Sequence, residues 1–352
     1  MERFLKLKEM VFPRDIIVGH NAIEKIPDLC ERLFEGKALV VEGKKTRKIA
    51  GEKVKNLLKG AKFDVSEITV TSSSNREVRK VQRFIEKEGI NFVVGVGGGK
   101  IIDVSKLSSS RCRVPFLSVP TAGSHDGIAS PMASIKDKNS PTSKKAISPM
   151  AIVADTNIIK KAPYRMLASG CADVISNLSA LKDWELAHRL KNEEFSSYAA
   201  SLSRTSAKLI MENADLIKTY TEEGVWLAVK GMIVSGVAMS VAGSSRPASG
   251  AEHMFSHALD MLAPGKALHG EQCGVGAIMM LYLHGEDWKE VRDILKEIGA
   301  PTNHKELGVP KKKIIDALVR AHSIRPERYT ILGDGGLTKE AAKNIAKKTG
   351  VI

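Results

Sequence analysis

The sequence predicts an α/β domain followed by an all-helical domain. Over residues 1–160, short runs rich in β-branched residues alternate with amphipathic helical patterns. Over residues 161–352 the β-rich runs stop and helical patterns dominate. Strands that alternate with helices are typical of a parallel sheet with crossover helices. We therefore expect a Rossmann-like nucleotide-binding domain first and an all-α domain second.

Six short apolar runs are the predicted strands of the first domain. They span residues 16–18, 38–41, 63–70, 92–94, 114–119 and 151–154. Helical patterns lie between them, for example at 77–88, where Val78 and Val81 share one face, and at 101–108. The segment 130–148 carries several lysines before the last strand, and it predicts a loop or a hairpin.

Long helical patterns fill the second domain. We expect helices at residues 172–190, 196–219, 222–241, 251–261 and 274–284, with shorter ones to the end. The longest apolar stretch, 225–243, is interrupted by Lys230 and rich in glycine and serine. A membrane span needs about 20 apolar residues without such interruptions, so we expect a buried helix and no stable membrane insertion.

The composition favours a globular protein with anionic small-molecule ligands. The net charge of +14 suits nucleic acid, a membrane surface or phosphorylated ligands. Aromatic residues make up only 5%, and no basic block with interleaved aromatic residues occurs, so we expect no nucleic-acid partner.

The cysteines and the amino terminus indicate a cytoplasmic protein. Cys30, Cys112, Cys171 and Cys273 are far apart and form no CxxC pair, which argues against a disulfide framework and against zinc held by sulfur. The first ten residues, MERFLKLKEM, are charged and lack an apolar signal core.

The segment GVGGGKIID, Gly95 to Asp103, follows a predicted strand and begins a predicted helix. Backbone N–H groups of Gly97, Gly98 and Gly99 in such a loop can hold a pyrophosphate, and the helix terminus adds positive charge. The spacing is neither GxGxxG nor GxxxxGK[ST]. A tight turn that needs positive φ is the alternative. Asp103 either complements the helix dipole or fixes the loop.

A second loop of small polar residues, PTAGSHDGIASP over 120–131, follows the next predicted strand. The carboxyl ends of parallel strands are where open α/β sheets bind ligands. Two such loops at neighbouring strand ends favour a ligand site over a plain connection.

Three histidines and one aspartate form a candidate metal site. His253 and His257 are spaced i, i+4 on one helix face, and His269 begins the next helical segment. A histidine pair alone would suggest a core or surface role. Asp173 lies among small and apolar residues and needs a partner such as a cation, unless it is only a helix-terminal charge. Two imidazoles and one carboxylate leave an open position, which suits catalytic Zn²⁺ and also permits Fe²⁺.

Together, GGGK with Asp103, PTAGSHDGIAS, GCADVISN with Asp173, EHMFSHALD and KALHGEQ resemble the family of iron-containing alcohol dehydrogenases, glycerol dehydrogenase and dehydroquinate synthase. The resemblance runs from about residue 10 to 345. It implies the dehydroquinate synthase-like architecture, with a metal-binding helical domain. Within the family, the motifs are most similar to the archaeal branch that acts on glycerol phosphates.

The resemblance also implies roles for individual residues. The residues implied to hold NADH or NADPH are Gly97, Gly98, Gly99, Lys100, Asp103, Thr121, Ala122, Gly123, Ser124 and Ser130. Asp173, His253 and His269 would bind Zn²⁺, or Fe²⁺. The substrate would contact Asp126, Asp173 and His257, and the catalytic set would be Asp173, His253, His257 and His269.

The charged side chains near the implied site leave open which cofactor is used and which residue binds the substrate phosphate. Glu42 follows the second strand, where an acidic residue favours the ribose of NAD, while Lys44, Lys45 and Arg47 are close enough to accept a 2′-phosphate. We expect both cofactors to be used. Four basic residues are available for a substrate phosphate, namely Lys136, Lys144, Arg246 and Lys266.

The resemblance implies the reduction of dihydroxyacetone phosphate to sn-glycerol 1-phosphate, for archaeal membrane phospholipid biosynthesis, by a homo-oligomer. Three alternatives remain. A glycerol dehydrogenase would act on an uncharged substrate, which the net charge disfavours. A dehydroquinate-synthase-like lyase calls for more lysine and arginine than residues 248–276 contain. A basic nucleic-acid-binding protein with a vestigial nucleotide fold would not need the Asp/His/His set.

Overall fold

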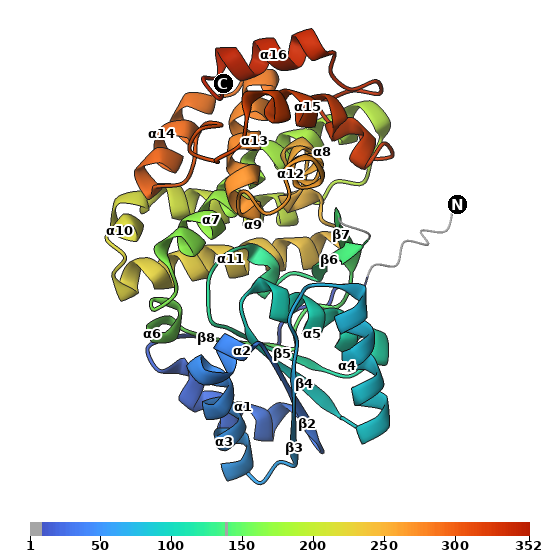
Figure 1. The fold of residues 1–352 in the computed structure, drawn as a ribbon, viewed down its shortest axis with the longest axis vertical. Helices are drawn as coiled ribbons and strands as arrows, with labels where there is room; N and C mark the ends of the chain where they lie inside the picture. Colours follow the sequence, from blue (N-terminus) through green and yellow to red (C-terminus); the bar gives the residue numbers. More distant parts are fainter. Residues whose placement is uncertain (1–8, 138–139) are drawn as a thin grey trace, which may run out of the picture.

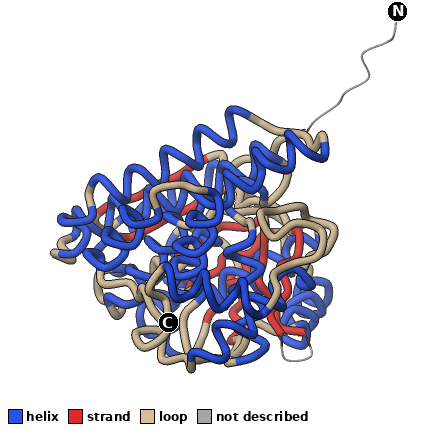
Figure 2. Tube along the Cα trace, turned by 90° about the horizontal axis from the view of Figure 1, so that it is seen from above, coloured by secondary structure: helices blue, strands red, loops and turns tan. Residues whose placement is uncertain are grey.

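The computed structural model describes residues 9–137 and 140–352. An α/β domain and a helical domain are stacked along the longest axis of the molecule (Figure 1). Seen from above, the helices of the second domain lie in front of the sheet (Figure 2). This architecture confirms the predicted fold class. The boundary predicted after residue 160 stays a prediction, and it lies in the turn between the last strand of the sheet and the first long helix.

All six predicted strands form one parallel sheet of order β1-β8-β5-β4-β2-β3. The strands are β1 (Asp15–Gly19), β2 (Ala38–Glu42), β3 (Val65–Thr69), β4 (Phe92–Gly97), β5 (Phe116–Pro120) and β8 (Ala151–Asp155). The strands β2, β4, β5 and β8 are buried along their whole length, which explains their continuous apolar runs. The predicted loop or hairpin is a hairpin of β6 (Met132–Asp137) and β7 (Ser140–Lys145).

Helices cover both faces of the sheet. The helical elements of this domain are η1 (Ala22–Lys25), α1 (Ile26–Leu33), α2 (Lys44–Thr46), η2 (Arg47–Gly51), α3 (Glu52–Gly60), α4 (Asn75–Glu88), α5 (Gly99–Cys112) and η3 (Asp126–Ile128). One apolar core joins α1 and α3 to the sheet, and another joins α4 and α5 to its opposite face. Val78, Val81 and Ile85 of α4 are buried at helical spacing, as the periodicity predicts.

The carboxyl ends of β2 and β4 meet where the chain leaves in opposite directions, toward β3 and toward β5. Ligands of open α/β sheets bind at such a switch point. Thr46 joins the two loops there, because its Oγ1 donates to the carbonyl of Val96 at 2.9 Å and accepts from the N–H of Gly43 at 2.9 Å. The fold therefore places GVGGGKIID at its expected ligand-binding edge.

The second domain is helical throughout its described length. A short helix, α6 (Thr156–Ile159), follows β8 and precedes this domain. The elements of the second domain are α7 (Tyr164–Ile175), α8 (Asn177–Lys191), α9 (Ser197–Glu212), α10 (Ala214–Lys218), α11 (Glu222–Ala242), η4 (Arg246–Ala248), α12 (Ala251–Leu262), α13 (His269–His284), α14 (Trp288–Ile298), α15 (Lys311–Ala321), η5 (His322–Ile324) and α16 (Lys339–Lys348). Most of them share one large apolar core, which includes Phe255 and Met279, and a smaller core around Trp184 joins α8 to α9.

Several helix boundaries of the second domain differ from the prediction, and α7 begins at Tyr164 instead of residue 172. The helix expected at 172–190 is broken between α7 and α8 at Ser176, whose Oγ donates to the carbonyl of Asp173 at 2.7 Å. The helix expected at 196–219 is broken between α9 and α10 at Asn213, whose side chain donates to the carbonyl of Leu209 at 2.8 Å. Such local bonds compete with helix continuation without changing the apolar periodicity. The helix expected at 274–284 begins earlier, at His269.

The apolar helix α11 runs across the junction of the two domains (Figure 1). It is long and apolar enough to cross a membrane, but 61% of its apolar window is buried inside the protein. The same helix packs against α9, α7 and η3. This burial confirms the expectation of a core helix.

The ring of Phe92 packs in the core of the first domain, and its substitution tests how much this packing stabilises the fold. It stacks on Phe34 at 4.6 Å between ring centroids and meets Phe63 edge-on at 5.4 Å. We expect Phe92→Ala to lower the free energy of unfolding by about 3–5 kcal/mol, because it leaves a cavity in a packed core. Urea unfolding followed by circular dichroism measures this. Leu190, which is 58% exposed, is the control: Leu190→Ala should change the value by less than about 0.5 kcal/mol. Equal losses in the two variants would contradict the assignment.

Candidate active site between the two domains

The three glycines where β4 ends and α5 begins differ in how much space surrounds them. A β-carbon on Gly97 would lie 2.5 Å from Ile101, and one on Gly99 would lie 1.9 Å from Nε2 of His125, so protein packing excludes side chains at both. A β-carbon on Gly98 would meet nothing within 4 Å. Gly98 is the N-cap of α5 with φ −77°, so the turn does not need positive φ. The loop therefore leaves open space at a helix terminus, which is the geometry for holding a phosphate.

The loop after β5 lies against both domains. The N–H of Thr121 donates to the carbonyl of Gly97 at 3.0 Å, which joins it to the glycine loop. Ala122 is buried, and a β-carbon on Gly123 would lie 3.3 Å from side chains of α7 and α11. The carbonyl of Ser124 accepts a hydrogen bond from Ser169 at 3.3 Å. The structure therefore brings residues 121–124 beside the glycine loop.

Asp103, Lys100 and Ser130 differ in burial. Lys100 is exposed on the first turn of α5, whereas Asp103 and Ser130 are buried. The fully buried Lys106 lies 3.8 Å from Oδ1 of Asp103, and its Nζ donates to the carbonyls of Gly127 and Met132 at 2.5 and 2.7 Å. Asp103 and Lys106 thus fix the loop that follows β5 to α5. Lys106 was missed because its place in the sequence reads as part of a solvated helix face.

Glu42 lies at its predicted place at the end of β2, but its carboxylate is turned inward. It is 1% exposed, and a β-carbon on Gly51 would lie 1.7 Å from its Oε2. Arg47 approaches it at 3.6 Å but donates to Glu67 at 2.7 Å. Burial raises the pKa of Glu42 to about 7, with the charge of Glu67 adding to the rise and Arg47 opposing it.

The candidate metal residues converge from three helices. Asp173 comes from α7, His253 from α12 and His269 from the first position of α13. Nε2 of His253 and Nε2 of His269 each lie 3.7 Å from Oδ1 of Asp173. The ring centroids of the two histidines are 4.9 Å apart. Cys273, one turn after His269, completes a group whose donor atoms all lie within 4.8 Å of one another.

A second layer of residues orients both imidazoles. Nδ1 of His253 lies 2.9 Å from Oε1 of the fully buried Glu252, which also accepts from Ser179 at 2.7 Å. Nδ1 of His269 lies 3.2 Å from Oγ of Ser256. These contacts leave the Nε2 atoms for a ligand, as in metal sites where a second partner fixes the ring.

Helix α13 starts close to α7 because Gly270 has no side chain. A β-carbon on Gly270 would lie 1.9 Å from the carbonyl oxygen of Ser169. The N–H of Leu268 donates to Oε2 of Glu271 at 2.8 Å and caps the helix. His269 is therefore presented toward Asp173 by a backbone approach that no larger residue would permit.

Asp126 and His257 lie beside this group. The N–H of Asp126 donates to Oδ2 of Asp173 at 3.1 Å, and its own Oδ2 accepts from Ser235 at 2.7 Å. Burial, together with the charge of Asp173, raises the pKa of Asp126 to about 6. The ring of His257 is 5.8 Å from that of His269. Burial, together with the charges of His253 and Arg325, lowers the pKa of His257 to about 3.

The geometry fits a divalent cation. Oδ1 of Asp173 is buried and, within the described residues, accepts no hydrogen bond. Burial also raises the pKa of Asp173, so the carboxylate lacks the partner that a charged group requires there. One carboxylate and two imidazoles suit Zn²⁺, and they also permit Fe²⁺. Sequence reasoning missed Cys273, although its i, i+4 spacing from His269 was a usable signal.

The basic residues considered for a substrate phosphate are only partly available. Arg246 is 3% exposed, and its Nε donates to Glu193 at 2.6 Å. Nζ of Lys144 donates to Asn75 at 3.0 Å, while Lys136 and Lys266 are exposed. Arg325 was missed by sequence reasoning. Its guanidinium forms no ion pair or hydrogen bond with the described residues, and its charge acts on His257.

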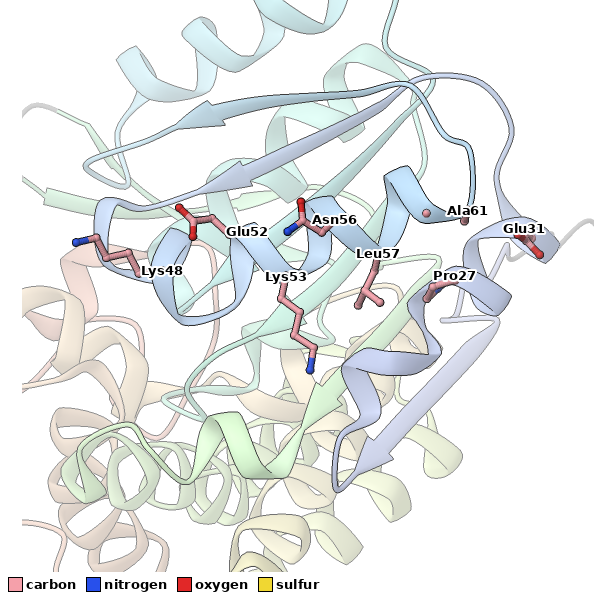
Figure 3. A pocket seen from close by; sticks show the side chains of 9 residues that line it. Pro27, Glu31, Lys48, Glu52, Lys53, Asn56, Leu57 and Ala61 are labelled. Atoms are coloured by element: carbon pink, nitrogen blue, oxygen red, sulfur yellow. The ribbon is translucent and has the colours of Figure 1, made fainter.

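The pocket in Figure 3 is not part of this site. It is a cavity of about 710 Å³ between α1 and α3, on the outside of the first domain. Its lining residues are Pro27, Glu31, Lys48, Glu52, Lys53, Asn56, Leu57, Gly60 and Ala61. None of the predicted site residues is among them.

The chain is similar to known proteins over its full length. Residues 17–163 match the family described as iron-containing alcohol dehydrogenase. The chain is 56% identical to a protein of Thermococcus kodakarensis named glycerol-1-phosphate dehydrogenase [NAD(P)+], with 100% of each chain covered. A protein of the same name from Methanothermobacter thermautotrophicus is 55% identical over 98% of this chain and 99% of its own.

Solved structures share the fold at low identity. Glycerol dehydrogenase from Schizosaccharomyces pombe superposes with a TM-score of 0.82 at 19% identity, covering 98% of this chain and 90% of its own. Sulfoacetaldehyde reductase from Bifidobacterium kashiwanohense, solved in complex with NAD⁺, gives a TM-score of 0.76 at 17% identity, covering 98% and 99%. These likenesses establish the architecture.

The buried Glu42 predicts a pH dependence of stability. Its pKa is raised in the folded state to about 7 from an ordinary 4.5, so between these values the folded protein retains a proton that the unfolded chain loses. The free energy of unfolding should therefore fall as pH rises from 4.5 to 7. Glu42→Gln removes this titration. We therefore expect the free energy of unfolding of the variant to rise by on the order of 2 kcal/mol, relative to that of wild type, between pH 4.5 and pH 8.

Urea unfolding of both proteins at pH 5, 6, 7 and 8 measures this difference. Glu212, which is exposed on α9, provides the matched control, and Glu212→Gln should run parallel to wild type. A constant difference between Glu42→Gln and wild type across the series would show that Glu42 does not titrate in this range.

Proposed function

The chain belongs to the glycerol-1-phosphate dehydrogenase family, and on that premise we propose that it reduces dihydroxyacetone phosphate to sn-glycerol 1-phosphate with NADH or NADPH. The product is the backbone of archaeal membrane phospholipids. The observation that carries the proposal is the likeness, over the full chain, to relatives named for this activity. The convergence of Asp173, His253 and His269 between the domains supports it.

The cofactor residues are those of the two loops at the sheet edge. We assign the diphosphate to the loop of Gly97, Gly98 and Gly99, because Gly98 leaves open space at the terminus of α5. The further residues assigned to the cofactor site are Lys100, Asp103, Thr121, Ala122, Gly123, Ser124 and Ser130. Asp103 and Ser130 would act by shaping the loop, because both are buried.

Asp173, His253 and His269 would hold the metal, with Zn²⁺ the ion we assign. When bound, the ion supplies positive charge for an oxyanion and the nicotinamide supplies the reducing equivalents. Glu252 and Ser256 keep both imidazoles oriented for binding. A catalytic site leaves one position for substrate. Cys273 therefore stays outside the assigned ligand set.

Asp126 and His257 would contact the substrate. The hydrogen bond from Ser235 fixes the Asp126 carboxylate, so that its other oxygen can accept from a substrate hydroxyl. His257 stays neutral because burial disfavours its charged form, and a neutral imidazole can donate one hydrogen bond and accept another. It is thus suited to hold the substrate and to pass on a proton.

We assign the substrate phosphate to Arg325. Among the described residues it has no ion-pair partner, and its charge lowers the pKa of His257. Arg246 is paired with Glu193 and is a weaker candidate. Exposed Lys136, near Asp260, and Lys266 could add to the positive field. A guanidinium binds phosphate through paired hydrogen bonds.

The surroundings of the reaction remain proposals. We assign the protein to the cytoplasm, since all four cysteines are free thiols. A homo-oligomer is expected, and an apolar depression that includes Met10, Phe12 and Tyr198 is a surface it could use. We assign neither nucleic acid nor a membrane as partner.

Alanine substitutions of His269 and His257 should distinguish a metal ligand from a proton-transfer residue. We expect His269→Ala to lose bound zinc and activity together, from about one ion per chain in wild type. His257→Ala should keep its zinc and lose about 10²- to 10⁴-fold in kcat, as for a proton-transfer residue. Inductively coupled plasma mass spectrometry and steady-state kinetics measure the two quantities.

Two further variants control this test. Cys273→Ala should retain zinc if the site has three ligands. His20→Ala changes a histidine whose side chain is 63% exposed, and it should behave as wild type. Turnover retained in His269→Ala would refute the metal assignment.

Substrate choice separates the proposal from its alternatives. We expect NADH and NADPH oxidation with dihydroxyacetone phosphate to exceed that with dihydroxyacetone by at least about 100-fold in kcat/KM, because charge-assisted hydrogen bonds to the phosphate are lost with the free ketone. Chiral analysis should give the sn-1 enantiomer. Turnover of the free ketone alone would indicate a glycerol dehydrogenase. NAD bound without turnover of either would indicate the lyase.

A further inference from the structure

The imidazole of His125 lies between the two loops of the cofactor site, and no role above uses it. Its Nδ1 accepts a hydrogen bond from the N–H of Gly127 at 2.9 Å. Its Nε2 faces the other loop, where a β-carbon on Gly99 would lie 1.9 Å away. A β-carbon on Gly127 would lie 2.2 Å from Cε1 of the same ring. One ring therefore requires glycine on both sides.

The hydrogen bond to Gly127 determines where the imidazole carries its proton. A neutral imidazole has one N–H, and a ring nitrogen that accepts a hydrogen bond must be the unprotonated one. Since Nδ1 accepts from a backbone amide, Nε2 carries the hydrogen. Nε2–H is therefore a donor beside Gly98 and Gly99, where the first amides of α5 have no helical partner.

We propose that His125 is a further cofactor-binding residue that donates Nε2–H to the diphosphate of the dinucleotide. The inference rests on the proposed function, which places a diphosphate at the glycine loop. Backbone amides and one side-chain donor then share the same anion, as charge-assisted hydrogen bonds do in anion sites.

The position of His125 also connects the cofactor to the substrate side. The next residue, Asp126, donates its backbone N–H to Asp173 and is held by Ser235. A diphosphate that binds His125 thereby fixes the backbone from which Asp126 projects. His125 acts on substrate binding as a positioning residue, through this segment.

Two conservative substitutions separate the two nitrogens of the ring. His125→Asn keeps an acceptor for the Gly127 amide but has no donor that reaches the place of Nε2, whereas His125→Gln restores an N–H near that place. We expect the dissociation constant for NADH, measured by calorimetry on zinc-loaded enzyme without substrate, to rise about 10- to 100-fold in His125→Asn and less than about 5-fold in His125→Gln.

ADP-ribose, which has the diphosphate but no nicotinamide, locates the contact. Its affinity should fall in His125→Asn by the same factor as that of NADH. Zinc content and thermal unfolding should match wild type in both variants, and His20→Asn is the matched control on the surface.

Three results would overturn the inference. They are an unchanged NADH affinity in His125→Asn, an equal loss in His125→Asn and His125→Gln, and a loss for NADH without one for ADP-ribose. Turnover of dihydroxyacetone phosphate by wild type is a separate readout. If wild type binds NADH and ADP-ribose but reduces no ketone, the proposed function fails while the affinities still decide the role of His125. Wild type that binds neither ligand would overturn both.

Discussion

The hydrogen bond from the Asp126 N–H to Oδ2 of Asp173, at 3.1 Å, is the constraint on which the site depends. It joins the loop after β5 to helix α7, and so joins the sheet to the helical domain. Because Oδ2 is occupied in this way, the buried Oδ1 is the oxygen that faces His253 and His269. One carboxylate thus links the two domains and supplies a candidate ligand.

The surrounding residues hold this arrangement before any ligand arrives. Glu252 is fully buried, and hydrogen bonds from Ser179 and the Gly250 amide satisfy it while it orients His253. Gln272 bridges Ser256 to Asp260, and it supports His269 indirectly, through Ser256. Groups held by packed neighbours lose little freedom on binding. The site is therefore preorganised for its ligand.

The sequence predicted the architecture and the membership of the candidate site well, because both depend on local patterns. Apolar runs of three to eight residues marked the six strands, and the i, i+4 spacing marked the face of α12. Breaks at Ser176 and Asn213 were missed because apolar periodicity continues through them. The orientation of Glu42 and the burial of Lys106 were missed because they depend on contacts that apolar periodicity does not encode, such as those with Gly51 and Met132. The predicted domain boundary and the individual site roles remain predictions.

The edge strand β1 has a consequence for how the molecule is made. It pairs along its whole length with β8, the last strand of the sheet to be synthesised, and is the outermost strand on that side. During translation β1 is therefore made before the other strands of the sheet, and it cannot pair with β8 until the rest of the sheet has been synthesised. Pairings between distant segments form slowly because a long loop must be closed first. Completion of this edge is thus a late step in folding, and the N-terminal strand closes the domain that the other strands have already begun.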